Sequence, residues 1–90
     1  RRSSDLSVEF INCTFNKSSY GTVRFYQPGR LENCTFDDEF EWVDIAKDGI
    51  SVEIFNCPTL PDSKLFLNSD SFADAHFIRD GVGVTGVTSH

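Results

Sequence analysis

A repeated tetrapeptide is the feature that most limits how this chain can fold. Asn-Cys-Thr-Phe occurs at 12–15 and again at 33–36, and a third Asn-Cys pair stands at 56–57. The pairs are 21 and 23 residues apart, and they contain all three cysteines of the 90-residue chain. Catalytic and metal-binding cysteines rarely recur at one long, even period, whereas structural repeats do. The residues that we interpret as a structural repeat are Asn12, Cys13, Asn33, Cys34, Asn56 and Cys57.

Strand-like alternation precedes these pairs. Val8 and Phe10 alternate with Glu9 before the first pair, and Val52-Glu53-Ile54-Phe55 precedes the third. Asparagine tolerates the left-handed backbone conformation, so Asn12 is expected to turn the chain after its strand. Nine phenylalanines and the absence of a sustained 3.6-residue apolar period favour strands over helices. The sequence therefore predicts an all-β fold of about eight short strands.

The length of the chain predicts a single domain, 1–90, in which residues 1–6 are a polar lead-in. Turn signals at Gln27-Pro28-Gly29 and Lys47-Asp48-Gly49 help to divide the remainder into units. The fourth unit is degenerate, with Asp80 near the expected asparagine position. We place the repeat units at about 7–28, 29–50, 51–73 and 74–90.

From Phe10 to Phe15, through Gly21-Thr22-Val23 and on to Leu31–Phe36, the chain resembles right-handed parallel β-helix repeats. The resemblance implies four two-strand coils of a small parallel β-solenoid, in which the Asn and Cys residues form ladders. It also implies one inner column of stacked side chains, made of Phe10, Leu31, Ile54 and Phe77. No capping segment is evident, so two open strand edges and edge-to-edge self-association are expected.

A spacing of 44 residues supports a second interpretation. Val52-Glu53-Ile54-Phe55-Asn56-Cys57 mirrors Val8-Glu9-Phe10-Ile11-Asn12-Cys13, which predicts two four-stranded Greek-key motifs forming a β-sandwich. From 52–55 through 84–87 the chain is similar to βγ-crystallin domains, and that resemblance implies a structural or calcium-binding protein. Asp62 stands where the family has glycine, and 79–84 lacks the family's calcium-loop pattern.

Charge and hydropathy limit the partners. The formal charge of −6 argues against nucleic acid and anionic membrane surfaces, since both attract basic patches. No apolar run approaches the roughly 20 residues that span a bilayer, so no membrane insertion is expected. The start Arg1-Arg2 and the absence of Met suggest a processed chain that is secreted or extracellular/luminal. Stacking of the repeated asparagines would exclude glycans there, which leaves Asn16 as the candidate glycosylation site.

No cofactor, metal or catalytic site is predicted. Zinc ligands usually come in close pairs, which Cys13, Cys34 and Cys57 do not form, so a site with His76 is disfavoured against buried thiols. Ser71, Asp74 and His76 are the residue types of a nucleophile triad, but a triad is defined by geometry, not by types. We therefore expect no enzyme.

The expected function is a secreted or cell-surface interaction module that binds a protein or glycan through a sheet face or an exposed strand edge. Trp42 and Tyr26 are candidates for a stacking platform, although a Trp within an alternating strand is more often a core residue. The densest acidic patch could hold a divalent cation but lacks the spacing of an EF-hand loop, so a solvated loop is expected for Asp37, Asp38, Glu39, Glu41 and Asp44. The candidate partner surface is Tyr26, Asp37, Asp38, Glu39 and Trp42.

Overall fold

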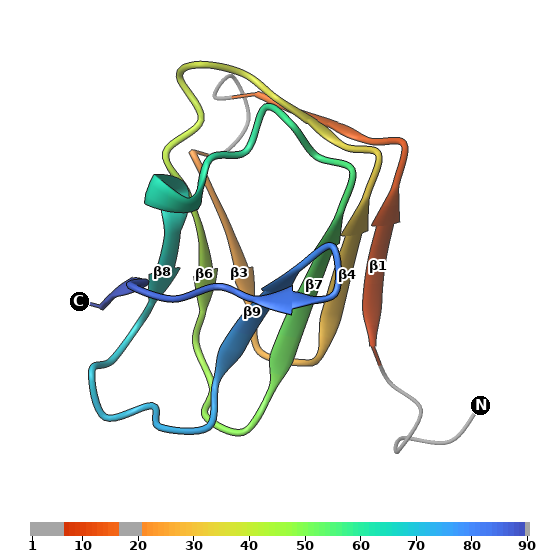
Figure 1. Ribbon diagram of the computed structural model, residues 1–90. Helices are drawn as coiled ribbons and strands as arrows, with labels where there is room; N and C mark the ends of the chain where they lie inside the picture. The colour runs from red at the N-terminus through yellow and green to blue at the C-terminus, as the bar shows by residue number, and fades with distance from the viewer. Residues whose placement is uncertain (1–6, 17–20, 90) are drawn as a thin grey trace.

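The chain winds as a β-solenoid of about four turns in the computed structural model, which describes residues 7–16 and 21–89 (Figure 1). The first coil contains β1 (Val8–Ile11), β2 (Thr14–Phe15) and β3 (Thr22–Phe25). The second contains β4 (Gly29–Glu32), β5 (Thr35–Phe36) and β6 (Trp42–Ile45). The third contains β7 (Ser51–Phe55), the 3-10 turn η2 (Asp62–Lys64) and β8 (Leu65–Leu67). The fourth contains β9 (His76–Arg79), β10 (Val82–Gly83) and β11 (Thr88–Ser89).

Equivalent strands of successive coils stack into parallel sheets. The first sheet has the order β1-β4-β7-β9-β10, the second β11-β8-β6-β3, and β2 pairs with β5 at a corner. Every pairing is parallel except that of β9 with β10. This topology confirms the all-β solenoid and shows that the β-sandwich interpretation is wrong. The described residues form eleven strands, not about eight, because two-residue strands also form at the corner and near the end of the chain.

Asparagines make the corner that follows the first sheet. Asn12, Asn33 and Asn56 have φ angles of 57°, 54° and 54°, the left-handed conformation expected from the sequence. The Asn56 Nδ2 donates to the Asn33 Oδ1 at 2.6 Å, so the amides of adjacent coils bond to each other. These side chains lie exposed on the outside of the corner, not inside the repeat. The cysteine that follows each asparagine turns inward.

The core lies between the sheets and is filled by the inward-facing residue of each alternating pair. Leu31 and Ile54 are fully buried in adjacent strands of the first sheet, and Val43 and Ile45 face them from β6. Gly29 also occupies an inward position, opposite Val52. A Cβ atom there would lie 2.3 Å from the Phe25 ring, so the glycine leaves room for this ring. The sequence alternation thus becomes a continuous apolar core.

The fourth coil departs from the predicted column. Arg79 is in register with Ile54, and Phe77 is in register with Val52, so Phe77 is not the fourth member of the column that contains Leu31. Asp80 and Gly81 follow with φ angles of 51° and 84°. Two successive left-handed residues form the tight turn of a β-hairpin, and they reverse the chain so that Val82 pairs with Arg79. The hairpin therefore ends the parallel stacking.

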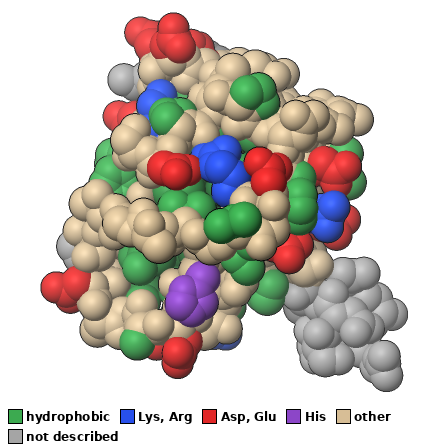
Figure 2. Space-filling view, viewed as in Figure 1, with side chains coloured by type: hydrophobic (Ala, Val, Ile, Leu, Met, Phe, Trp, Pro, Cys, Tyr) green, Lys and Arg blue, Asp and Glu red, His purple; other side chains and the backbone are tan. Residues whose placement is uncertain are grey.

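The same segment covers one end of the solenoid. The Arg79 guanidinium donates to the carbonyl oxygens of Leu60 and Cys57 and bonds to the Asp62 carboxylate at 2.8 Å. Val84 and Val87 pack against the core from outside. In Figure 1 the segment from β10 to β11 crosses in front of the earlier coils, and Figure 2 shows basic and acidic side chains side by side on this end. The expectation of an uncapped chain is therefore wrong at this end.

Candidate interaction surfaces

The outer face of the second sheet carries a group of aromatic and charged side chains. Thr22 pairs with Trp42 and Arg24 with Asp44, and Asp44 in turn pairs with Phe66 of β8. Val43 and Ile45 face the core, so their neighbours Trp42 and Asp44 face outward. Tyr26 follows β3 and is 59% exposed. We call Arg24, Tyr26, Trp42, Phe66 and the central Asp44 the aromatic face.

Asp44 is the buried centre of the aromatic face. Its side chain has no exposed surface, although it lies on the outside of the sheet. The expectation that Asp44 belongs to a solvated loop is therefore wrong, because it lies within β6. The Arg24 Nε and Nη2 atoms lie 3.1 Å from the Asp44 Oδ2. A hydrogen bond to Tyr26, together with the Asp44 carboxylate, raises the pKa of the Arg24 guanidinium. The two contacts with Oδ2 hold the Arg24 guanidinium against the buried carboxylate.

The ring of Trp42 packs beside that of Phe66, with centroids 5.5 Å apart and planes at 59°. Neither ring belongs to the apolar cluster between the sheets. The prediction that a Trp in an alternating strand is a core residue is therefore wrong for Trp42. The alternation along β6 indicates the correct side. Because the aliphatic residues at 43 and 45 face inward, the side chain at position 42 faces outward.

Of the other predicted surface residues, the acidic ones lie apart from Tyr26. Asp37, Asp38 and Glu39 are exposed at the corner between β5 and β6. The Glu39 amide donates to the Asp37 carboxylate, and the Lys64 Nζ donates to the Asp38 carbonyl oxygen at 3.1 Å. The corner therefore adjoins the Trp42 end of β6, whereas Tyr26 follows the opposite end of β3.

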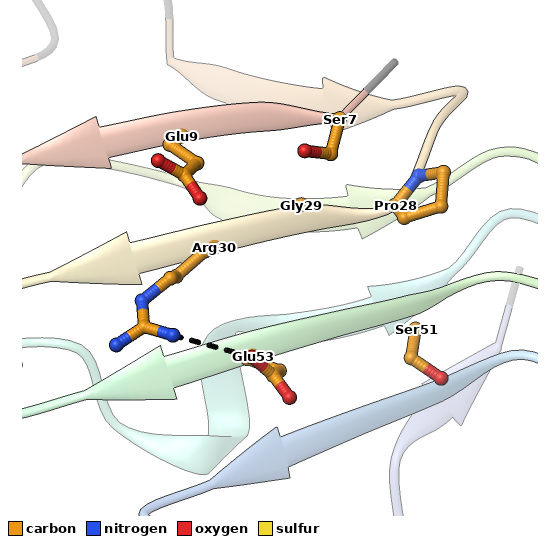
Figure 3. Close-up of a pocket in the computed structure, with 7 residues that line it drawn as sticks. All are labelled: Ser7, Glu9, Pro28, Gly29, Arg30, Ser51 and Glu53. Carbon is orange, nitrogen blue, oxygen red and sulfur yellow. Dashed lines mark ion pairs between the residues drawn. The ribbon is translucent and has the colours of Figure 1, made fainter. Parts of the chain in front are cut away.

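A shallow hollow of about 250 Å³ lies on the outer face of the first sheet (Figure 3). The short side chains of Ser7, Pro28 and Ser51 form its floor, because these positions lie side by side at the start of β1, β4 and β7. Longer side chains of the next outward row, Glu9, Arg30 and Glu53, form one rim. Two carboxylates and one guanidinium give this rim a negative charge. The hollow thus favours a small neutral or positively charged group.

Arg30 is held by its own neighbours. Its guanidinium donates to the Glu32 Oε1 at 3.0 Å, lies 3.7 Å from the Glu53 Oε1, and is 4.5 Å from the centre of the Phe55 ring. These contacts leave the Arg30 side chain lying along the sheet surface.

Four residues of these surfaces were not predicted as site residues from the sequence: Arg24, Asp44, Phe66 and Arg30. The opposite charges of Arg24 and Asp44 at matching places in consecutive units were the available signal.

The three cysteines are free thiols. Cys34 and Cys57 are buried, and Cys13 is half-buried in the first coil. The Cys34 amide donates to the Cys57 sulfur at 3.4 Å, and each buried thiol donates to a backbone carbonyl of the preceding coil. Burial raises the pKa of the Cys57 thiol. Among the described residues no group of three or more His, Cys, Asp or Glu side chains is arranged to hold a metal ion.

The residues of the supposed triad do not form a relay. The Ser71 hydroxyl bonds to that of Ser69 at 2.8 Å, and the Asp74 amide bonds to the Asp48 carboxylate. His76 is exposed on β9.

Asn16, the candidate glycosylation site, is exposed just after β2, and its glycosylation stays a prediction.

The geometry defines the class of this protein: a small, four-coil parallel β-solenoid with one covered end. Comparison with protein-family models, with curated proteins and with solved structures finds no match. Among helices in the described part of the chain, none has the length and apolar character needed to cross a membrane.

Proposed function

We propose that this chain is a non-enzymatic interaction module of a secreted or cell-surface protein, and that a protein partner binds its aromatic face. The observation that carries the proposal is the exposed Tyr26 ring beside an Arg24 that is fixed by a buried carboxylate. Tyr, Trp and Arg are the residue types that dominate binding energy at protein interfaces. Here all three lie on the outer face of the second sheet.

The bonds within the aromatic face favour binding, because they reduce the side-chain entropy that a partner must remove. Immobilising a flexible long side chain at an interface costs roughly 0.5–1.5 kcal/mol in lost entropy. Arg24 is already held by Asp44, and Trp42 packs beside Phe66. The face therefore meets a partner with much of this cost already incurred in folding.

A protein is favoured over a glycan because of how the polar groups are used. A sugar needs carboxylates and amides that remain open to its hydroxyl groups beside the stacking ring. The carboxylate of the aromatic face, that of Asp44, is buried and bonded to Arg24. The Greek-key fold on which the calcium-binding alternative rested is absent, so that function is not proposed.

The proposal is tested by probing an array of extracellular protein domains with the biotinylated chain. Binding to any array member is then measured by calorimetry for the wild type, Tyr26→Ser and Val82→Ser. Val82 is the matched control, since it is an exposed apolar residue, 68% exposed, on the capped end. Loss of at least about tenfold in affinity is expected for Tyr26→Ser, with no change for Val82→Ser. No binding, or equal loss in both variants, would refute the proposal.

A further inference from the structure

The two ends of the solenoid differ in how well the core is covered. At the fourth coil the core is closed by Arg79, Val84 and Val87. At the first coil five inward residues are only half-buried, whereas their counterparts one coil later are buried. The half-buried residues of the first coil are Val8, Phe10, Cys13, Phe15 and Val23.

Two of these residues belong to a cluster of phenylalanine rings. Phe15 stacks on Phe36 with centroids 4.9 Å apart, and Phe10 meets Phe15 edge-on at 5.3 Å. Phe36 and the neighbouring Phe40 are buried. The aromatic core therefore continues to the surface of the first coil and stops there with two incompletely covered rings.

The backbone of β1 has a free edge beside these rings. The Val8 amide donates to the Pro28 carbonyl oxygen and the Asn12 amide to that of Glu32. In a parallel ladder the amide and carbonyl of one residue point the same way, so Val8, Phe10 and Asn12 face β4. Glu9 and Ile11 therefore point their amides and carbonyls to the opposite side. Among the described residues no strand pairs with that side of β1.

We propose that the chain forms a two-fold symmetric dimer in which β1 pairs antiparallel with β1 of a second copy. Such a pairing continues the first sheet across both molecules and keeps the two cores on the same side. Its register is centred on Phe10, so that Phe10 of each copy stands opposite the same residue of the other. Glu9 then stands opposite Ile11, and these two pairs exchange four backbone hydrogen bonds.

Charge selects this register over the neighbouring one. Shifting the centre by one residue, to Glu9, would also match the free backbone groups, but it would place two Glu9 carboxylates directly opposite each other. Like charges directly opposite across strands are destabilising, whereas a central aromatic pair is favourable. Centring on Phe10 places the uncovered ring against its equivalent in the second copy.

The covered end explains why the free edge of β1 pairs with one further copy and does not start a growing stack of copies. Head-to-tail stacking needs the free edge of β1 to meet a matching edge at the fourth coil. That edge is occupied by β10, a two-residue strand that follows a tight turn. Very short edge strands disfavour further pairing. An interface that uses the same edge on both molecules closes after two copies.

The dimer is tested first by sedimentation equilibrium of the whole chain over a wide concentration range. Ile11→Pro removes an amide hydrogen that points to the free edge and takes no part in the β1–β4 ladder. The matched control is Ile11→Thr, which keeps this amide. We expect a monomer–dimer equilibrium whose dissociation constant rises at least about tenfold in Ile11→Pro and little in Ile11→Thr. A wild type that stays monomeric overturns the proposal, as do equal effects of the two variants.

The register is tested by cross-linking in a Cys13→Ser background. Phe10→Cys places thiols in a non-hydrogen-bonded pair, where Cα atoms are about 4.5 Å apart and a disulfide fits. Under mild oxidation this variant should form a covalent dimer, while the matched Glu9→Cys variant should not. Cross-linking through Glu9→Cys alone would overturn the register. Circular dichroism confirms that both variants fold.

Amide hydrogen exchange distinguishes a second copy from a segment of the same chain. In the dimer, exchange at Glu9 and Ile11 slows as concentration rises, because their amides enter hydrogen bonds only on association. Protection of both amides in a monomer, independent of concentration, would mean that the chain covers its own edge and would overturn the proposal. This outcome leaves the proposed function of the aromatic face untouched, since the two surfaces are separate.

Discussion

Replacing Asn33 tests whether the left-handed corner is an essential part of the fold. Asn33 has a φ of 54°, and its Oδ1 accepts a hydrogen bond from Asn56. Alanine in this conformation costs roughly 1–2 kcal/mol, because its Cβ approaches the following carbonyl oxygen. Loss of an exposed hydrogen bond adds about 0.5–1 kcal/mol. Asn33→Ala should therefore lower the free energy of unfolding by about 1.5–3 kcal/mol.

Glycine separates the two contributions. Asn33→Gly also removes the side-chain bond but adopts a positive φ without strain, so it should cost only about 1 kcal/mol, including the added flexibility of the unfolded chain. The alanine variant should therefore be the less stable one. At a position with negative φ the order of stability reverses, since glycine increases the conformational entropy of the unfolded chain and so destabilises the fold.

Asn68 supplies the matched control. It is exposed like Asn33 but is not among the described residues with a positive φ. Urea unfolding, monitored by circular dichroism, should give a larger free energy of unfolding for Asn33→Gly than for Asn33→Ala. At position 68 it should be larger for Asn68→Ala than for Asn68→Gly. If Asn33→Ala equals or exceeds Asn33→Gly in stability, the backbone of the corner does not require a left-handed residue and the reasoning fails.

Three other changes probe the core and the aromatic face. Arg24→Leu leaves the buried Asp44 carboxylate without its guanidinium and should cost about 3 kcal/mol in urea unfolding, whereas Arg24→Leu with Asp44→Leu should recover part of that loss. A double variant no more stable than the single one would contradict this. Gly29→Ala forces a methyl group against the Phe25 ring and should lower the unfolding free energy by about 1–3 kcal/mol; a neutral result would show that the ring moves freely. The raised pKa of Cys57 means that the folded state favours the protonated thiol. Its contribution to the free energy of unfolding is therefore complete below pH about 9 and is lost as pH rises through the raised pKa. Under reducing conditions, stability should therefore fall more steeply above pH 9 for the wild type than for Cys57→Ala, and parallel pH curves would refute the assignment.

The repeat predicted the winding of the chain because its residues have local physical roles. An asparagine that follows an alternating strand predicts a left-handed corner, and the corner fixes where each coil turns. The cysteine after it is small enough to face inward, as Cys34 does. Alternation alone then decides which side chains enter the core. Each of these inferences uses only neighbours in the sequence.

The end of the solenoid was not predicted, because two local patterns compete there. Asp80 adopts the same left-handed conformation as the asparagines, and in the sequence it resembles a degenerate corner. The glycine that follows makes Asp-Gly, a strong signal for a two-residue hairpin. The hairpin is formed, and it moves Arg79 into the position where an apolar residue was expected.

Predicting the aromatic face requires the register between β3, β6 and β8, which the sequence only partly indicates. Tyr26 and Trp42 were recognisable as surface candidates by residue type. That Arg24 meets Asp44 follows only when β3 and β6 are aligned 20 residues apart, one of the irregular spacings between units. The burial of Asp44 on an outer face, between its register partners Arg24 and Phe66, is also shown by no local pattern.

The hairpin at Asp80-Gly81 has a consequence for the length of the fold. Each coil presents the next with the same parallel strands, the same inward alternation and the same corner, so nothing in the core specifies four turns. The reversing dipeptide fixes where the parallel stacking ends. A duplicated 22-residue unit inserted between the first and second coils would then lengthen the molecule without altering either terminus of the stack. A local turn thus ends the parallel stack, independently of the core contacts that stabilise each coil.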